Sequence, residues 1–507
     1  MASSTEMMSL KLFTPSKMPR LNPGVKRHIT PSPEASARVN GVTISPKKTS
    51  TSSSLLTSTP RKRLFPDAPM SEATPGTLSS VTPPYAVALT MSSDDVFNFT
   101  ARTLTAVHHN IFTTCHEILF EDFALLEDGL YVGAGSRENW DRIGGLFPGC
   151  LFVSWFAPFV IIVVESLPPK PWPLTVGGAP LYITTDPDSR GPYMGRLGQG
   201  EEVLTEDQAK GGTISYTLMR KAADYLVTTL GLGVTTVDWY GCFWVITVAD
   251  GTPLKSLPCR LMDLMCRYKF ASQVNTPEEA AFRHHRPRGM TWDMSDYYPN
   301  LRPGIMLSSS DRSVTAGMAV QNAAGEKFMT APSHAFTVAE EEVFHPDNNG
   351  RRVGVCDRYL DDSNIALIKL DPSVTFAETT FEDEAQRGTA MPTTGYADLH
   401  RVTIGDQLVM NNPFSGFCTA MHLGIRFQHR IPTDEPVPKL DWHQFELSYL
   451  GNGLIEPLDG SCGTIVQDQK TGDAVSIFRF VERGTGIGFA TATTALKKFG
   501  YEPTTIP

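Results

Sequence analysis

The chain has 507 residues, of which 41% are hydrophobic and 19% charged, so it is long enough for two or three globular domains. Its formal net charge of −10 argues against a protein that coats nucleic acid, and we predict no specific nucleic-acid binding. Eight cysteines with no CxxC pair exclude a disulfide framework and disfavour a structural zinc site. We therefore expect neither a cofactor nor a metal.

Residues 1–92 are rich in Ser, Thr, Pro and basic residues and poor in aromatic residues. Residues 1–90 carry 11 Lys+Arg and 4 acids, a charge of +7, which leaves −17 for the rest of the chain. Such a composition cannot bury enough apolar surface to offset chain entropy, so we expect a disordered basic tail. The first residues lack the apolar core of a secretory signal. We therefore expect an intracellular protein, cytoplasmic or nuclear, with reduced thiols.

The tail contains short motifs that suggest regulation. Thr14–Lys17, Ser45–Lys48 and Thr59–Lys62 each place a hydroxyl before proline and a base three positions on, which resembles the consensus of cyclin-dependent kinases. Lys62–Phe65 resembles a cyclin-docking segment, and the two basic clusters around Lys48 and Arg61 resemble a bipartite nuclear-import signal. A proline-directed kinase and an import receptor are thus candidate partners. Chance matches in a tail of this composition are the alternative.

Residues 93–295 predict an α+β domain of unknown role. Apolar spacing predicts helices over Val96–Leu125, Glu206–Leu232 and Leu261–Phe270, and β-branched residues predict a strand or hairpin over Val234–Val248. The apolar run Cys150–Val164 is shorter than the ~20 residues of a membrane span and contains a proline. We expect it to form buried strands and the protein to have no membrane segment.

Residues 300–507 consist of short β-like runs with turn residues between them, followed by a helical segment, Thr494–Phe499. Many short strands with a C-terminal helix are typical of Greek-key barrels. The predicted strands are Val314–Gln321, Lys327–Ala331, Ile365–Leu370, Gln407–Met410, Gly416–His422, Phe445–Leu450, Thr464–Gln467, Val475–Phe480 and Gly488–Ala490.

Polar groups at three of these strand boundaries form a catalytic pattern. His334 follows the strand Lys327–Ala331, where a base is held firmly and can face a cleft. Asp362 and Asn364 precede Ile365–Leu370 and can orient a histidine. Cys462 lies on a glycine-flanked turn before the strand at Ile465, and glycines there allow backbone N–H groups to converge.

These segments resemble the trypsin-like, chymotrypsin-fold peptidases, in which histidine, aspartate and nucleophile follow in this order. Met329–His334 resembles that family's T-A-A-H, Asn364–Leu370 its D-I-A-L-x-x-L, and Gly460–Thr464 its G-D-S-G-G. The resemblance covers about the last 200 residues. The cysteine in the nucleophile position is similar to that of the main proteases of picornaviruses and coronaviruses. A double-barrelled intracellular peptidase is the function implied.

The resemblance also implies a role for each residue. His334 would be the base, Cys462 the nucleophile, and Asn364 or Asp362 the group that orients the imidazole. The N–H groups of Gly460 and Cys462 would bind the oxyanion, and a peptide or protein substrate would add as a strand beside 475–480.

Glu456 falls where the family has the base of its specificity pocket, which would suit a basic substrate residue. The residue before the nucleophile is Ser461 and not the family's Asp, so activation by a new N-terminus is not expected.

Alternatives remain open at this stage. Ser461 is a second candidate nucleophile, and the third catalytic member is either Asn364 or Asp362. Two of the three catalytic positions differ from the family's usual residues, which is also typical of an inactive peptidase-fold protein that binds other proteins. The remaining alternatives are an unrelated β-rich protein and a protein whose middle region is the functional part.

Overall fold

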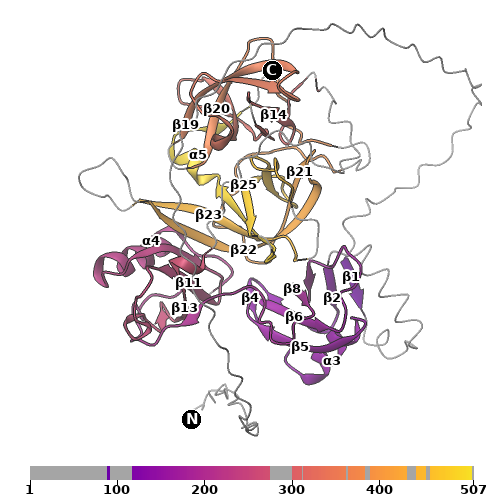
Figure 1. Ribbon diagram of the computed structural model, residues 1–507, viewed down its shortest axis with the longest axis vertical. Helices are drawn as coiled ribbons and strands as arrows, with labels where there is room; N and C mark the ends of the chain where they lie inside the picture. Colours follow the sequence, from indigo (N-terminus) through magenta and orange to yellow (C-terminus); the bar gives the residue numbers. More distant parts are fainter. Residues whose placement is uncertain are drawn as a thin grey trace, which may run out of the picture. The chain divides into compact units, whose positions relative to one another are not determined.

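The computed structural model describes residues 88–91, 117–209, 211–274, 298, 300–310, 312–360, 363–382, 389–430, 441–452, 457–482 and 484–504 (Figure 1). All of them belong to one compact unit, Ser79–Pro507. The kinase, docking and import motifs of the tail lie outside the described residues, so they stay predictions. The last residues of the expected tail, Ala88–Met91, form strand β1, which runs parallel to β2.

The first sheet has six strands in the order β1-β2-β7-β8-β6-β5. The apolar run forms the hairpin β5–β6, which confirms the strands. Every residue of β6 is buried as expected, but burial is wrong for β5, where Leu151 and Phe152 are exposed. No helix among the described residues is long and apolar enough to cross a membrane. The strands are β2 (Glu117–Phe120), β5 (Cys150–Phe156), β6 (Phe159–Val164), β7 (Thr175–Val176) and β8 (Ala179–Thr184), with helix α3 (Arg137–Gly145) and the small hairpin β3 (Leu126–Glu127) and β4 (Leu130–Tyr131) beside them.

The helix expected over Val96–Leu125 is wrong where it can be checked, because Glu117–Phe120 is strand β2. Ile118 and Phe120 are both buried and lie two positions apart, which is the spacing of side chains on one face of a strand. This strand pattern is present in the sequence beside the helical one. The helix expected over Leu261–Phe270 is also wrong. Its residues form β12 (Arg260–Leu261) and β13 (Leu264–Phe270), and β13 pairs in parallel with β11.

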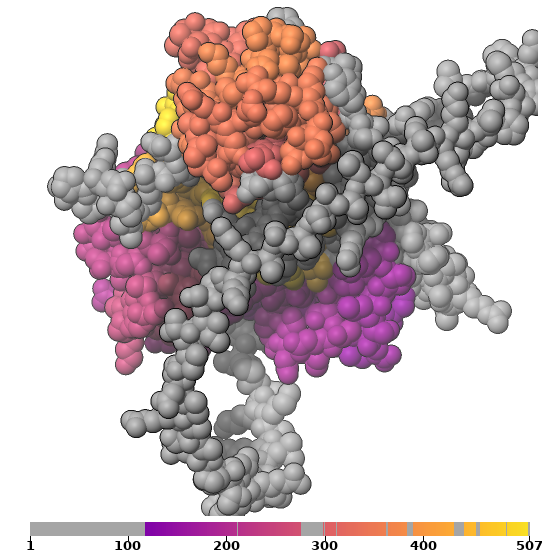
Figure 2. Space-filling view, turned by 45° about the horizontal axis from the view of Figure 1, so that its top comes forward, coloured from indigo at the N-terminus to yellow at the C-terminus, as the bar shows by residue number. Residues whose placement is uncertain are grey.

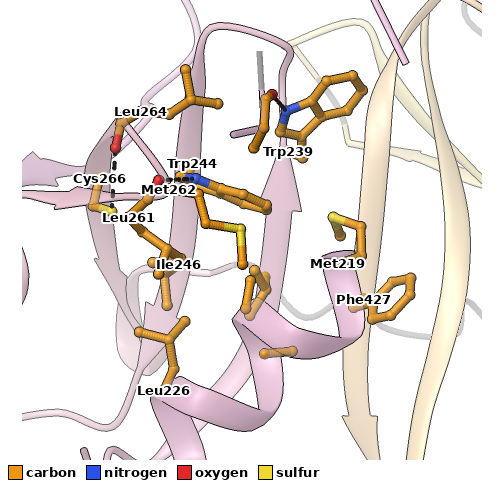
Figure 3. Packing of buried hydrophobic residues seen from close by; sticks show 14 of the residues in the cluster. Met219, Leu226, Trp239, Trp244, Ile246, Leu261, Met262, Leu264, Cys266 and Phe427 are labelled. Atoms are coloured by element: carbon orange, nitrogen blue, oxygen red, sulfur yellow. Dashed lines mark hydrogen bonds between the residues drawn. The ribbon is translucent and has the colours of Figure 1, made fainter. Parts of the chain in front are cut away.

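The second predicted helix is confirmed over its C-terminal half. It consists of α4 (Tyr216–Asp224) and a π-helical turn, η1 (Tyr225–Thr229), and begins where the Ser215 hydroxyl accepts a hydrogen bond from the Leu218 N–H at 3.2 Å. One face of this helix, formed by Met219, Ala222, Ala223 and Leu226, is fully buried. Met219 and Leu226 face the Trp239 and Trp244 side of the adjoining sheet (Figure 3).

That adjoining sheet has eleven strands and joins the middle of the chain to its end. The predicted hairpin is confirmed as β10 (Val234–Trp239) and β11 (Phe243–Val248). The sheet order is β12-β13-β11-β10-β22-β21-β24-β25-β26-β23, with β9 (Arg196–Leu197) beside β13. The C-terminal members are β21 (Gln407–Asn412), β22 (Gly416–Arg430), β23 (Asp441–Tyr449), β24 (Ile465–Asp468), β25 (Ala474–Glu482) and β26 (Ile487–Ala492).

Strands β21 to β26 close on themselves, because β23 pairs with both β26 and β22. The 15-residue β22 extends beyond this closed ring, and its residues 425–428 pair with β10 (Figure 1). Phe427 and Trp442 therefore share a core with α4. The boundary that the sequence suggested between residues 295 and 300 does not divide this sheet. The two-domain division and the Greek-key order of the barrels remain predictions.

The eight-stranded sheet is built from residues 306–370 and the end of the chain, in the order β15-β14-β18-β19-β20-β17-β16-β27. Its atoms gather in one lobe (Figure 2). The predicted strands at 327–331 and 365–370 are confirmed, whereas the strand predicted over Val314–Gln321 is interrupted at 316–318. The members are β14 (Met306–Ser308), β15 (Ser313–Thr315), β16 (Ala319–Gln321), β17 (Lys327–Pro332), β18 (Glu342–His345), β19 (Arg351–Leu360), β20 (Ile365–Leu370) and β27 (Glu502–Pro503), and the predicted C-terminal helix is α5 (Thr494–Lys498).

Candidate active site

The ends of β17 and β20 hold the histidine and the asparagine together. These strands are antiparallel neighbours in which Pro332 pairs with Ile365, so the residues just outside the pair, Ser333 and Asn364, lie side by side. The Ser333 N–H donates to the Asn364 carbonyl at 3.0 Å. A single helical turn, η4 (Ser333–Ala335), follows and carries His334, whose carbonyl accepts a hydrogen bond from the Arg312 guanidinium.

Asn364 has a left-handed backbone conformation, with φ at +57°. Asparagine and aspartate adopt this conformation more readily than other residues with a side chain. Its Oδ1 lies 3.0 Å from His334 Nδ1 and also accepts from the Ser333 hydroxyl at 3.0 Å. Since an amide oxygen only accepts hydrogen bonds, this arrangement requires the proton of neutral His334 on Nδ1 and leaves the Nε2 lone pair for another group.

That other group is the thiol of Cys462. Its Sγ lies 3.3 Å from His334 Nε2, although the two residues are 128 positions apart in the chain. His334 and Asn364 come from the eight-stranded sheet, whereas Cys462 precedes β24 of the eleven-stranded sheet. The structure thus brings together three of the four predicted catalytic residues. The fourth, Asp362, lies outside the described residues, as does Glu456.

The bend at Cys462 depends on two glycines. Gly460 has φ at +97°, and a Cβ on it would lie 2.4 Å from the Phe414 ring. Gly463 has φ at +96°, and a Cβ there would lie 2.2 Å from the Thr315 carbonyl oxygen. Both positions therefore exclude a side chain for steric as well as conformational reasons.

The alternative nucleophile, Ser461, has its hydroxyl bonded elsewhere. It lies 2.5 Å from the Ser415 hydroxyl and donates to Asn412 Oδ1 at 3.2 Å, and Ser461 is completely buried. Both partners belong to the β21–β22 hairpin. The geometry therefore favours Cys462 as the group that faces the imidazole.

Cys462 is 4% exposed, and this burial raises the pKa of its thiol to about 12. The backbone N–H groups of Cys462 and Gly460 face the sulfur and lower the pKa, as does Arg479, whereas Asp459 raises it. The direction is opposite to that of a preformed thiolate–imidazolium pair. The resting site holds a neutral thiol, so an attack by sulfur requires transfer of its proton to His334.

Strand β25, beside which a substrate is predicted to add, is paired on both sides over only part of its length among the described strands. β24 pairs with β25 only as far as Ile477, whereas β26 pairs with β25 up to Glu482. Residues 480–482 therefore pair with a strand on one side only among the described strands. Phe480 stacks on Phe489 of β26 at 4.6 Å between ring centroids, which stiffens this edge.

Sequence reasoning did not find the residues that support the site. Thr315 donates through its hydroxyl to the Gly460 carbonyl at 2.8 Å and through its N–H to the Cys462 carbonyl at 3.1 Å. Thr315 lies 145 positions from Gly460, so no local pattern signals the contact. In the described part of the chain, no group of three or more His, Cys, Asp and Glu side chains can hold a metal.

Comparison with known proteins gives matches in structure alone. No family model matches the chain, and no curated protein matches it. Among solved structures, a Nocardiopsis protease (NAPase) is 15% identical over 40% of this chain and 100% of its own, with a TM-score of 0.30. A tobacco vein mottling virus protease is 12% identical over 39% of this chain and 82% of its own, with a TM-score of 0.20. At these scores the function has to be inferred from the geometry of the site itself.

Proposed function

We propose that the chain is a peptidase that hydrolyses peptide bonds with Cys462 as nucleophile and His334 as general base. The observation that carries this proposal is the aligned series Cys462 Sγ, His334 Nε2, His334 Nδ1 and Asn364 Oδ1, with separations of 3.3 and 3.0 Å. Nucleophile, base and orienting group are all within the reach that such chemistry needs.

The mechanism follows from the neutral resting state. His334 Nε2 takes the thiol proton as the sulfur attacks the substrate carbonyl, and Asn364 stabilises the imidazolium by accepting from Nδ1–H. The N–H groups of Gly460 and Cys462 stabilise the oxyanion. His334 then gives its proton to the departing amine, which leaves a thioester on Cys462. Water, activated by His334, hydrolyses the thioester and restores the thiol.

A peptide library tests the proposal without knowledge of the substrate. Peptides derived from a whole proteome are incubated with the full chain, and new termini are identified by mass spectrometry. We expect cleavages with the wild type that are absent with Cys462→Ala and with His334→Ala. Cys259→Ala, which removes a partly exposed cysteine elsewhere, is the matched control and should cleave as the wild type does. Identical peptide sets from wild type and Cys462→Ala would exclude hydrolysis and favour a binding protein.

Alkylation by iodoacetamide tests the proton transfer separately. Because burial raises the pKa of the Cys462 thiol, its labelling should increase with pH beyond the ~8.5 of an ordinary thiol. His334→Ala should slow labelling of Cys462 near neutral pH and leave labelling of Cys259 unchanged. Equal labelling of Cys462 in both proteins would exclude His334 as its base.

A further inference from the structure

In the bend that carries Cys462, the carbonyl oxygens of Gly460, Ser461 and Cys462 all accept hydrogen bonds. The Gly460 carbonyl accepts from the Thr315 hydroxyl at 2.8 Å, and the Cys462 carbonyl accepts from the Thr315 N–H at 3.1 Å. The Ser461 carbonyl accepts from the Thr464 hydroxyl at 2.6 Å and from the Thr464 N–H at 3.2 Å. Thr315 thus holds the carbonyls on both sides of Ser461, and Thr464 holds the carbonyl of Ser461 itself.

The N–H groups of the same bend fall into two sets. Those of Ser461 and Gly463 donate to the carbonyls of Leu458 and Phe478, at 3.1 and 2.9 Å. Those of Gly460 and Cys462 face the sulfur, and within the described part of the chain neither donates to a backbone carbonyl. Among the described residues, the bend therefore leaves these two N–H groups available to a developing oxyanion.

Thr315 is suited to hold this arrangement because its own position is fixed. It is the last residue of β15, is completely buried, and pairs with Met306 of β14. Its hydroxyl donates to the carbonyl of the Gly460–Ser461 peptide, whose N–H end is bonded to Leu458. Both ends of that peptide are therefore bonded. It lies between the two peptides that carry the Gly460 and Cys462 N–H groups, so rotating it to change their relative orientation breaks two hydrogen bonds.

We propose that Thr315 is a positioning residue for oxyanion binding, acting through the Gly460 carbonyl. This inference rests on the proposed peptidase function and adds to it the device that keeps the site assembled. Ser461, bonded to Ser415 and Asn412, anchors the bend to the eleven-stranded sheet, while Thr315 anchors it to the eight-stranded sheet.

Two probes separate oxyanion binding from thiol chemistry. A peptide aldehyde built on the best-cleaved library sequence forms a thiohemiacetal, whose oxygen occupies the oxyanion position. Iodoacetamide alkylates the sulfur at a saturated carbon and forms no oxyanion. A residue that positions only the N–H groups affects the first probe and spares the second.

Thr315→Val removes the hydroxyl and keeps the shape, whereas Thr315→Ser keeps the hydroxyl. We expect Thr315→Val to weaken aldehyde binding and lower kcat by about 10-fold or more, with KM and the rate of Cys462 alkylation within about two-fold of wild type. Thr315→Ser should restore both losses. Thr247→Val, which removes a buried hydroxyl in β11, is the control and should leave all four quantities unchanged.

The inference is overturned if Thr315→Val binds the aldehyde as the wild type does, or if it loses alkylation as strongly as aldehyde binding. Should the valine variant fail to fold, as judged by circular dichroism, Thr315→Ala takes its place in the same comparison. A wild type that binds no aldehyde and cleaves no peptide refutes the proposed function itself, and this inference with it.

Discussion

The two large sheets contribute different kinds of groups to the candidate site. The eight-stranded sheet provides side chains, His334 and Asn364, at the adjacent ends of β17 and β20. The eleven-stranded sheet provides a bend whose backbone N–H groups face its own cysteine. The groups proposed for proton transfer thus lie at strand ends, where a side chain can be oriented. The N–H groups proposed to stabilise the oxyanion lie in a loop, where the backbone can turn.

The sheets also differ in how they are held to the rest of the chain. Residues 425–428 of β22 pair with β23 inside the closed ring on one side and with β10 on the other. The Arg426 guanidinium joins β22 to β10 through two hydrogen bonds to the Asp238 carboxylate, each 2.7 Å long. Asp238 is 1% exposed there. The corresponding ion pair of the eight-stranded sheet, Arg352–Asp371, is largely open to solvent. Integrity of the nucleophile's sheet thus depends on a buried charge, which gives the comparison its first test.

Asp238→Ala should give the largest effect, because it leaves Arg426 buried without its partner. We expect a loss of about 3–5 kcal/mol in the free energy of unfolding, measured with urea. Arg352→Ala, the control at an exposed pair, should cost much less, because solvent screens that pair. Similar losses in the two variants would contradict the distinction between the sheets.

Gly460→Ala tests the bend. The new Cβ would overlap the Phe414 ring and displace the Gly460 N–H, so we expect turnover of a library-derived peptide to fall by about 10²–10³-fold. Gly484→Ala has a similar φ, +76°, with no atom within 4 Å of its Cβ. It should show only the strain of the left-handed backbone and keep full activity. Retained turnover in Gly460→Ala would remove the oxyanion role of this residue.

Asn364 tests the side-chain half of the site. Asn364→Gly suits the left-handed backbone but removes the amide, and we expect kcat to fall by about 10²-fold, short of the ~10⁴-fold seen when a serine enzyme holds the wrong tautomer. Asn364→Asp keeps an acceptor at the same place and should retain activity. Steady-state kinetics on one peptide distinguishes them. Equal activity in Asn364→Gly and wild type would leave Asp362 as the third member.

His345 gives the smallest effect and concerns stability alone. It is buried in β18, where its Nδ1 lies 2.7 Å from the Met306 carbonyl and its Nε2 accepts from the Tyr298 N–H at 3.1 Å. Burial lowers its pKa, so the folded protein keeps it neutral while the unfolded chain takes up a proton below pH ~6.5.

The sign follows directly: stability contributed by neutral His345 is complete above pH ~6.5 and declines as the pH falls toward the lowered folded pKa. We expect the free energy of unfolding to decrease between pH 7 and 5.5, measured with urea. His345→Gln, which can donate and accept at the same places, should reduce this slope. An unchanged slope in His345→Gln would show that other groups produce it.

Most strands predicted in the last third are confirmed because turn residues bound them, although β22 extends well past its predicted end and Val314–Gln321 is interrupted. The wrongly predicted helices could not be recognised as strands from the sequence. Leu261–Phe270 has apolar residues at both helical and strand spacings, and only pairing with β11 decides between the two structures. β19 (Arg351–Leu360) was missed for a related reason. Its charged residues at 351, 352, 357 and 358 hide the apolar alternation that the folded sheet reveals.

The sequence by itself determined which residue types stand at which strand ends: a histidine after one strand, an asparagine before another, and a cysteine between glycines. Those are local properties, set by turn chemistry and backbone sterics. Only the tertiary structure decided that Cys462 is buried and neutral, that Ser461 is bonded to the hairpin beneath it, and that Thr315 holds the bend from 145 residues away. Burial and long-range hydrogen bonds depend on which strands meet, and no pattern within one strand contains that information.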